Sequence, residues 1–91
     1  MMLEVIPSAR FKRDLRTAAR RGCNFDLLAE VVNTLAARLP LPEKNRDHAL
    51  SGDYHGCREC HIAPDWLLVY QSDEESLKLY LMRTGTHSDL F

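Results

Sequence analysis

The stretch Trp66-Leu67-Leu68-Val69-Tyr70 decides the fold. It is apolar at odd and at even positions, as expected of a strand that is buried on both faces, so we place it at the centre of a sheet. Ala63-Pro64-Asp65 before it has turn chemistry, because proline presets the backbone angle that a turn needs. Residues 56–62 and residues 77–82 alternate in polarity. These three segments predict consecutive antiparallel strands.

The N-terminal third predicts a short strand followed by a helix. Residues 3–6 form an apolar, β-branched run that stops at Pro7, and Ser8 can cap the helix that follows. Gly22 can end that helix in a left-handed conformation. The apolar side chains between these two points recur at helical spacing: Phe11, Leu15, Ala18 and Ala19.

A second helix is predicted to begin near Asn24 or Asp26 and to end before Pro40 and Pro42, which cannot continue it. Its core face consists of Leu27, Leu28, Val31, Val32, Leu35 and Leu39. Residues 39–54 then form a polar loop, and loops of that length are often functional. The predicted fold is α+β, with an N-terminal helical hairpin packed on a three- or four-stranded antiparallel sheet.

Length and charge limit the classes of function. A chain of 91 residues makes one domain, residues 1–91, and it contains no apolar run that could cross a bilayer and no signal-peptide pattern, so we expect a cytoplasmic protein. The net charge is −1, yet residues 1–22 are basic and the remainder is acidic. Arg16 and Arg20 of that basic segment can contact RNA phosphates or an acidic partner, although a solvated helix face explains them equally well.

Three of the four histidines lie in polar clusters, at residues 47–52, 61–66 and 83–91. Imidazole can both give and take a proton near neutral pH, and a nearby arginine can hold a phosphate with a planar set of donors. His61 and Asp65 flank a tight turn, which should bring them close together. Several histidines, a carboxylate and an arginine in so small a chain indicate cleavage of RNA without a metal ion.

The cysteines offer a competing interpretation. Cys57-Arg58-Glu59-Cys60-His61 matches the attachment pattern of c-type haem and half of a zinc site. However, positions 57 and 60 of a strand point to opposite faces, and no second ligand pair follows at a recognisable spacing. We therefore expect Cys23, Cys57 and Cys60 to be reduced thiols. A small metal or redox module remains an alternative that metal analysis of the purified protein would test.

With these motifs in place, the chain resembles type II toxins of the RelE/ParE superfamily, specifically the YafQ branch. The resemblance covers nearly the whole length and is strongest at residues 39–42, 44–52, 61–70 and 83–87 and at the end, Leu90-Phe91. It implies a RelE-like fold and a ribosome-dependent endoribonuclease that cuts mRNA in the A site. It further implies inhibition by a cognate antitoxin, contact with operator DNA only through that antitoxin, and no cofactor.

The resemblance also implies the site residues, which in this sequence are His48, His61, Asp65, Trp66, Arg83, His87 and Phe91. In attack by the RNA 2′-hydroxyl, His87 would be the general acid, Asp65 or His61 the base, and Arg83 the group that holds the phosphate oxygens. His48 would contact phosphate or tune a neighbour, and Phe91 would stack on a base. Trp66 would contact RNA, although its place before an apolar strand favours the core.

A toxin of the same fold that binds gyrase instead, as in the ParE type, is the main rival. The histidines distinguish the two, because a gyrase inhibitor does not need a set of proton-transfer groups.

Overall fold

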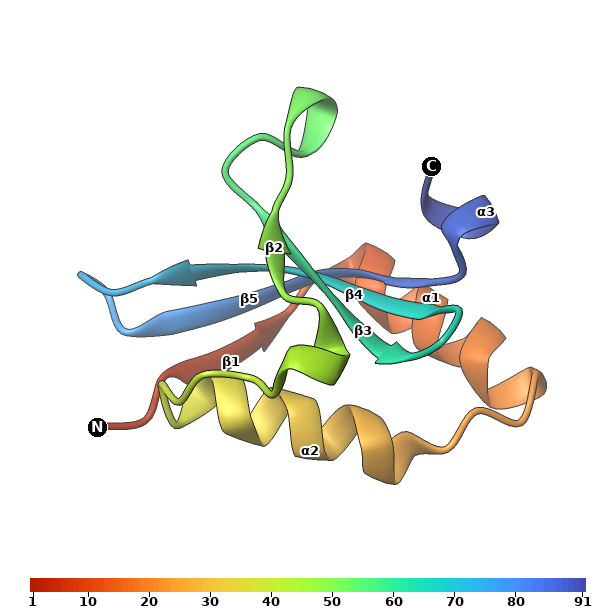
Figure 1. The fold of residues 1–91 in the computed structure, drawn as a ribbon, viewed down its shortest axis with the longest axis horizontal. Helices are drawn as coiled ribbons and strands as arrows, with labels where there is room; N and C mark the ends of the chain where they lie inside the picture. Colours follow the sequence, from red (N-terminus) through yellow and green to blue (C-terminus); the bar gives the residue numbers. More distant parts are fainter.

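A computed structural model describes all residues of the chain and shows a five-stranded sheet in the order β1-β5-β4-β3-β2. Neighbouring strands are antiparallel except β1, which runs parallel to β5 (Figure 1). The strands are β1 (Glu4–Pro7), β2 (His48–Ala49), β3 (Arg58–Ala63), β4 (Trp66–Asp73) and β5 (Lys78–Gly85). The strand predicted from residues 66–70 is confirmed, and β4 lies at the centre of the sheet. The strand count exceeds the predicted three or four because the loop at residues 39–54 contributes the two-residue strand β2.

The helices begin where the sequence indicates. They are α1 (Ala9–Arg20), α2 (Phe25–Ala36) and the short α3 (His87–Leu90), with 3-10 turns η1 (Glu43–Asn45) and η2 (Gly52–Tyr54). The Ser8 and Asn24 side chains accept hydrogen bonds from the first turns of α1 and α2. The predicted Ser8 cap is thereby confirmed, and Asn24 is the cap at the predicted start of α2. The second helix is shorter than predicted, because Arg38 has a positive φ of 62° and the chain turns there.

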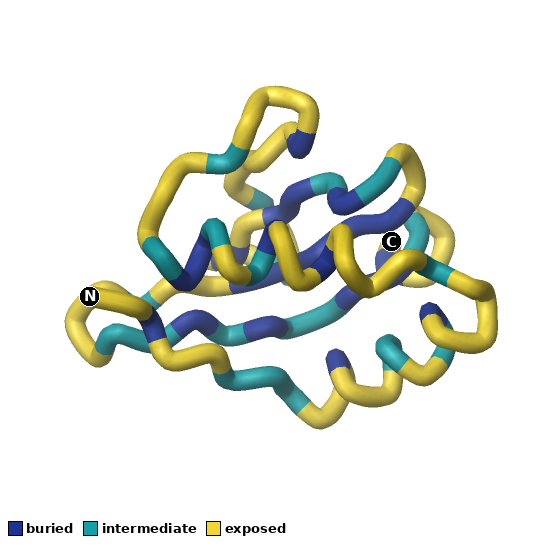
Figure 2. The backbone as a smooth tube through the Cα atoms, turned by 90° about the horizontal axis from the view of Figure 1, so that it is seen from below, coloured by how far each residue is buried: buried dark blue, intermediate teal, exposed yellow.

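Both long helices pack on one face of the sheet, where they form the main core (Figures 1 and 2). Phe11 and Leu28 from the helices meet Cys60, Leu68 and other residues of the inner strands there. The opposite face carries a smaller apolar cluster: Cys57, Leu67, Val69 and Leu90. Cys57 and Cys60 therefore belong to clusters on opposite faces, as the parity argument predicted. None of the helices combines the length and apolar character that crossing a bilayer requires.

Strand β5 contains an irregularity that changes which face its last residues occupy. Val69 pairs with Arg83, but the adjacent Tyr70 pairs with Leu81, so Met82 is an extra residue on β5. If side chains alternated regularly along this strand, Arg83 would lie on the same face of the sheet as Leu81. The bulge instead places Arg83 opposite Val69, whose side chain belongs to the second face.

Helix α1 continues along the edge of β5 beyond the end of β1. The Ser8 backbone N–H donates to the Leu81 carbonyl at 2.9 Å, and the Ser8 hydroxyl donates to the Met82 carbonyl at 2.9 Å. Nearly two turns further on, Asp14 accepts a hydrogen bond from the backbone N–H of Thr84 at 3.1 Å. The helix thus satisfies backbone groups of β5 that β1 is too short to reach.

Candidate active site

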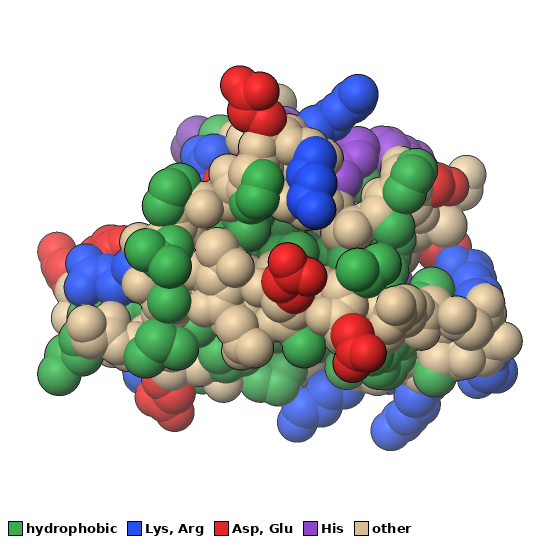
Figure 3. Space-filling view, turned by 60° about the horizontal axis from the view of Figure 1, so that its bottom comes forward, with side chains coloured by type: hydrophobic (Ala, Val, Ile, Leu, Met, Phe, Trp, Pro, Cys, Tyr) green, Lys and Arg blue, Asp and Glu red, His purple; other side chains and the backbone are tan.

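Two imidazoles from distant parts of the chain meet on the second face of the sheet. His61 belongs to β3 and His87 begins α3, and their ring centroids lie 5.6 Å apart at an interplanar angle of 64°. Both line a hollow of about 560 Å³, together with Lys44, Asn45, Arg46, Ile62, Ala63 and Pro64. Figure 3 shows the histidines, in purple, beside lysine and arginine side chains, in blue. The fold therefore brings together two proton-transfer groups that lie far apart in the sequence.

Asp65 holds His87 in a defined orientation. Its Oδ1 accepts hydrogen bonds from the His87 backbone N–H at 3.1 Å and from Nδ1 at 2.8 Å. With Nδ1 donating to the carboxylate, Nε2 of His87 is the nitrogen left to exchange a proton with a substrate. The hydrogen bond from the imidazole, followed by that from the backbone, lowers the pKa of Asp65. Asp65 is thus present as an acceptor that orients the imidazole.

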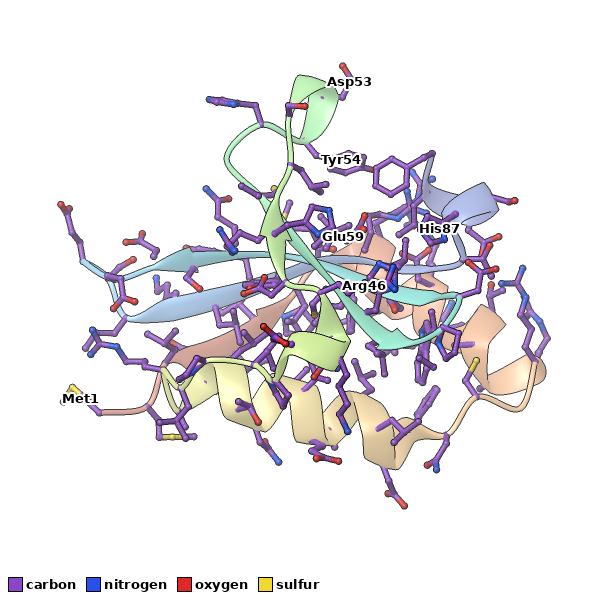
Figure 4. All side chains as sticks on the ribbon, viewed as in Figure 1. Met1, Arg46, Asp53, Tyr54, Glu59 and His87 are labelled. Atoms are coloured by element: carbon purple, nitrogen blue, oxygen red, sulfur yellow. The ribbon has the colours of Figure 1, made fainter.

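Glu59 is a functional candidate that the sequence reasoning missed. Its side chain is only 6% exposed, and its Oε1 lies 3.6 Å from Nε2 of His48 and 3.9 Å from Nε2 of His61. Figure 4 shows Glu59 on the same side of the sheet as His87. The available signal was the shared parity of Glu59 and His61, which places a carboxylate beside an imidazole on one strand face.

The loop that carries His48 is held by several polar contacts. The buried Asn45 donates from Nδ2 to the His61 carbonyl at 2.7 Å, which ties η1 to β3. Asp47 accepts from the Tyr70 hydroxyl at 2.6 Å and from Arg58 at 3.2 Å. His48 itself is half-exposed, and its Nδ1 lies 2.7 Å from the Arg46 carbonyl oxygen. These contacts place β2 against β3 and bring His48 opposite Glu59.

The turn before His87 is built on a small residue and a capping box. Thr86 caps α3 by accepting from the Asp89 backbone N–H, and Asp89 accepts in return from the Thr86 backbone N–H. Arg21, at the end of α1, donates to both carboxylate oxygens of Asp89, and these contacts hold the pKa of Asp89 well below its usual range. A Cβ on Gly85 would lie 2.8 Å from Oδ2 of Asp89. The position of His87 therefore requires glycine at 85.

Arg83 is engaged by Asp14 rather than facing the hollow of His61 and His87. Its guanidinium donates from Nε at 2.8 Å and from Nη2 at 3.2 Å to the two Asp14 oxygens. These hydrogen bonds raise the pKa of Arg83, and partial burial opposes the shift. Arg83 lines a second, smaller hollow of about 190 Å³, which also includes Asp65. The expected role in holding phosphate oxygens stays a prediction, and the structure shows that this guanidinium already has a carboxylate partner.

The four predicted RNA contacts lie in different settings. Trp66 is 6% exposed and packs beside Phe25 in the main core, the setting that its place before an apolar strand favours, and its contact with RNA stays a prediction. Its Nε1 is buried without a hydrogen-bond partner. Phe91 is 62% exposed, with its ring edge against Tyr54, and is available to a base. Arg16 and Arg20 are exposed on α1 and line neither hollow.

One set of side chains has the donor atoms for a metal ion. One ligand atom from each of Glu59, His61 and His87 lies within 4.8 Å of the others. A carboxylate and two imidazoles are donors that zinc and copper accept. The cysteine module weighed from the sequence does not form, since Cys57 and Cys60 lie in separate clusters and burial raises the pKa of the Cys60 thiol to about 12.

The two long helices cover one face of the sheet, and the histidine–carboxylate cluster lies on the other. Known proteins that match this chain are small bacterial toxins. A family profile described as "Bacterial toxin of type II toxin-antitoxin system, YafQ" matches residues 3–91. The chain belongs to this YafQ family. The resemblance inferred from the motifs is thereby confirmed.

Three relatives match this chain over nearly the full length. The mRNA interferase toxin YafQ of Escherichia coli K12 is 35% identical over 85 residues, which are 92% of this chain and 90% of that protein. The crystal structure of a metal-bound toxin from Helicobacter pylori has a TM-score of 0.93 and 43% identity, and covers 99% of this chain and 100% of that one. The E. coli DinJ-YafQ toxin-antitoxin complex contains a chain with a TM-score of 0.89 and 33% identity, covering 100% and 99%.

Proposed function

We propose that this chain is an endoribonuclease toxin that cuts mRNA on the ribosome by attack of the 2′-hydroxyl on the adjacent phosphate. The observation that carries the proposal is the pair of imidazoles, His61 and His87, 5.6 Å apart on the margin of one hollow. Internal attack requires a base at the 2′-oxygen and an acid at the 5′-oxygen, one on each side of a single phosphate. Two imidazoles at this separation can serve the two sides. The 2′-oxygen bonds to phosphorus, the 5′-oxygen leaves with the proton from the acid, and the upstream fragment ends in a 2′,3′-cyclic phosphate.

The contacts support a division of roles between the two histidines. His87 has its Nδ1 bound to Asp65, which leaves Nε2 to protonate the 5′-oxygen as the general acid. His61 is the base, with Glu59 Oε1 at 3.9 Å to stabilise the positive charge that the ring gains with the proton. Asp65 positions His87 and is engaged twice by it, so it is the weaker candidate for the base. Each of the two steps contributes about 10²–10⁴ in rate.

The partner of this toxin is a cognate antitoxin, as in the E. coli DinJ-YafQ complex. We expect an acidic segment of the antitoxin to lie on α1, where Arg16 and Arg20 are exposed and free of ion pairs. Operator DNA would then be contacted through the antitoxin. Reversing both charges should weaken the toxin–antitoxin complex, and an unchanged affinity would contradict this placement.

The decisive experiment uses two programmed ribosome complexes that differ in one atom of the message. With an unmodified message, cleavage should leave a 2′,3′-cyclic phosphate that mass spectrometry detects, and EDTA should not prevent it. With a single 2′-deoxy nucleotide at the mapped scissile position, cleavage there should stop. Continued cutting of the deoxy message would rule out internal attack.

A variant pair tests the roles of the residues. The His87→Gln toxin should bind its antitoxin normally but lose about 10²–10⁴ in the cleavage rate. The matched control is His55→Gln, because His55 lies outside both hollows and has no ion pair. Equal cleavage by the His87 and His55 variants would refute the acid assignment.

Metal binding at Glu59, His61 and His87 is a second candidate function, favoured by the three donor atoms within 4.8 Å and by the metal-bound H. pylori relative. A metal ion there would occupy imidazole nitrogens that proton transfer needs, so it would inhibit the nuclease. Calorimetric titration with Zn²⁺ or Cu²⁺ tests this independently of activity, and the His87→Gln variant should bind the ion more weakly.

A further inference from the structure

The hollow beside the two histidines is lined by basic groups, and the carboxylates of Glu59 and Asp65, which lie against the imidazoles, are not part of its lining. Its side chains include Lys44, Arg46, His61 and His87, and the remaining lining residues are uncharged. Neither Lys44 nor Arg46 takes part in an ion pair or a side-chain hydrogen bond, and both are exposed. A hollow of about 560 Å³ has the size of a small-molecule site. It therefore suits an anion of the size of a nucleotide.

Arg83, the arginine that the sequence singled out for phosphate, is not free to take this role. Both Asp14 oxygens accept hydrogen bonds from it, and the side chains are only 14% and 13% exposed. A phosphate that approached the Nε–Nη2 edge of the guanidinium would have to displace a carboxylate that is already well placed, and Arg83 does not line the hollow of His61 and His87. Lys44 and Arg46 need no such exchange, because they have no partner to release.

The backbone at Arg46 is held in an unusual conformation that serves the site. Its φ of 48° lies in the left-handed region, which costs a non-glycine residue about 1–2 kcal/mol. This conformation ends η1, and the Arg46 carbonyl lies 2.7 Å from Nδ1 of His48. The side chain meanwhile lines the hollow beside His87 (Figure 4). One residue thus orients His48 through its backbone and supplies a cation through its side chain.

We propose that Arg46, assisted by Lys44, is the group that binds the RNA phosphate between His61 and His87, and that Arg83 is a structural residue. This inference rests on the proposed function, since it identifies what holds the backbone of the same RNA. The planar guanidinium of Arg46 can donate two parallel hydrogen bonds to the non-bridging phosphate oxygens. The ammonium of Lys44 adds a second positive charge on the same side of the hollow.

The first test measures binding of a short 2′-fluoro RNA, which internal attack cannot cleave. Replacing Arg46 by Gln should weaken binding by about tenfold or more, the loss expected for hydrogen bonds to a charged group. It should also reduce the slope of log Kd against log salt by about 0.7, the value for one phosphate contact on a single strand. Arg46→Lys should retain the salt slope and lose only part of the affinity.

Arg38→Gln is the matched control for this measurement. Arg38 also has a positive φ, 62°, and is exposed, but it pairs with Glu74 and lines a different hollow. The Arg38 variant should bind the RNA as the unchanged protein does. An equal loss in the Arg38 and Arg46 variants would show general charge attraction and overturn the proposal.

The second test identifies the contacting arginine directly. In ¹⁵N-labelled protein titrated with the 2′-fluoro RNA, the side-chain Nε–H resonance of Arg46 should shift and that of Arg83 should not. A shift of Arg83 without one of Arg46, or no shift of either, would overturn the proposal. This measurement does not depend on catalysis. If Arg46 bound the RNA but the protein never cut it, the proposed nuclease activity would be refuted and the proposed phosphate-binding role of Arg46 would stand.

Discussion

Removing the Arg83 guanidinium should lower the unfolding free energy of the protein, and not only its rate of RNA cleavage. In Arg83→Ala, Asp14 would lose both hydrogen bonds from the guanidinium and keep only the one from the Thr84 backbone N–H. Breaking a buried ion pair costs about 3–5 kcal/mol, and a hydrogen bond to a charged group contributes about 1.5–3 kcal/mol. Because both side chains are slightly exposed, 14% and 13%, we expect a loss near the lower end, about 2–4 kcal/mol of unfolding free energy.

The single tryptophan makes this loss straightforward to measure. Trp66 is buried at the start of β4, so its fluorescence reports unfolding in urea. For a domain of this size, each 1 kcal/mol corresponds to roughly 4–8 °C in Tm, so Arg83→Ala should melt roughly 10 °C or more below the unchanged protein. Asp14→Ala and the double variant complete a double-mutant cycle. The double variant should lose much less unfolding free energy than the sum of the losses in the two single variants.

The result that would refute this reasoning is specific. If Arg83→Ala unfolded at the same urea concentration as the unchanged protein while RNA cleavage fell steeply, the guanidinium would be acting on the substrate. Additive losses in the cycle would also contradict a structural pair. Arg58→Ala is the comparison variant, since Arg58 binds Asp47 through a longer contact of 3.2 Å with a more exposed side chain. Its loss should be about 1 kcal/mol or less.

Three further outcomes follow from other contacts. Glu59→Gln should lower the maximal cleavage rate by about 10–10³-fold. The reason is that a unit charge at 3.9 Å stabilises protonated His61 by at most about 4 kcal/mol. Unchanged single-turnover cleavage on ribosomes would contradict this expectation. Asp89 has a lowered pKa, so its contribution to stability is present above about pH 4 and is lost as the pH falls further. Urea unfolding at about pH 7 and about pH 3 should thus show a smaller acid loss in Arg21→Ala than in the unchanged protein, and equal losses would refute the link. Gly85→Ala places a Cβ 2.8 Å from Oδ2 of Asp89 and should cost about 1–3 kcal/mol in thermal unfolding, together with most of the cleavage; an unaltered Tm would show that the turn can adapt.

The parts of the fold that were predictable from sequence are those set by local rules. The central strand β4 follows from a run that is apolar on both faces. Helix α1 begins one residue after the expected cap Ser8, and α2 begins at Phe25, within the predicted start near Asn24 or Asp26. Cys57 and Cys60 fall on opposite faces because strand alternation is strict over so few residues. Each of these features depends on neighbours along the chain, which a single sequence contains.

The features that were missed depend on contacts between distant segments. The bulge at Met82 places Arg83 on the opposite face of the sheet from the one that alternation predicts. The alternating sequence contains no signal that marks Met82 as an inserted residue. Strand β2 has only two residues and exists because His48 and Ala49 pair with β3. Asp14 lies on a helix whose other charges are basic, and its partner is 69 positions away. Glu59 had a sequence signal in its shared parity with His61, but no local rule marks it as buried.

The charges of the site favour the proposed binding of RNA, although the chain has a slightly negative net charge. The net charge is −1, yet no carboxylate lines the hollow of His61 and His87. Three aspartates nearby are each taken up in holding a segment: Asp47 binds Tyr70 and Arg58, Asp65 binds His87, and Asp89 binds Arg21. Charges that are paired in this way contribute little field beyond their partners, whereas Lys44 and Arg46 are left unpaired. The acidic residues therefore set the geometry of the histidines, and the unpaired basic residues set the local potential, so replacing an aspartate should disturb position while replacing Arg46 should disturb attraction.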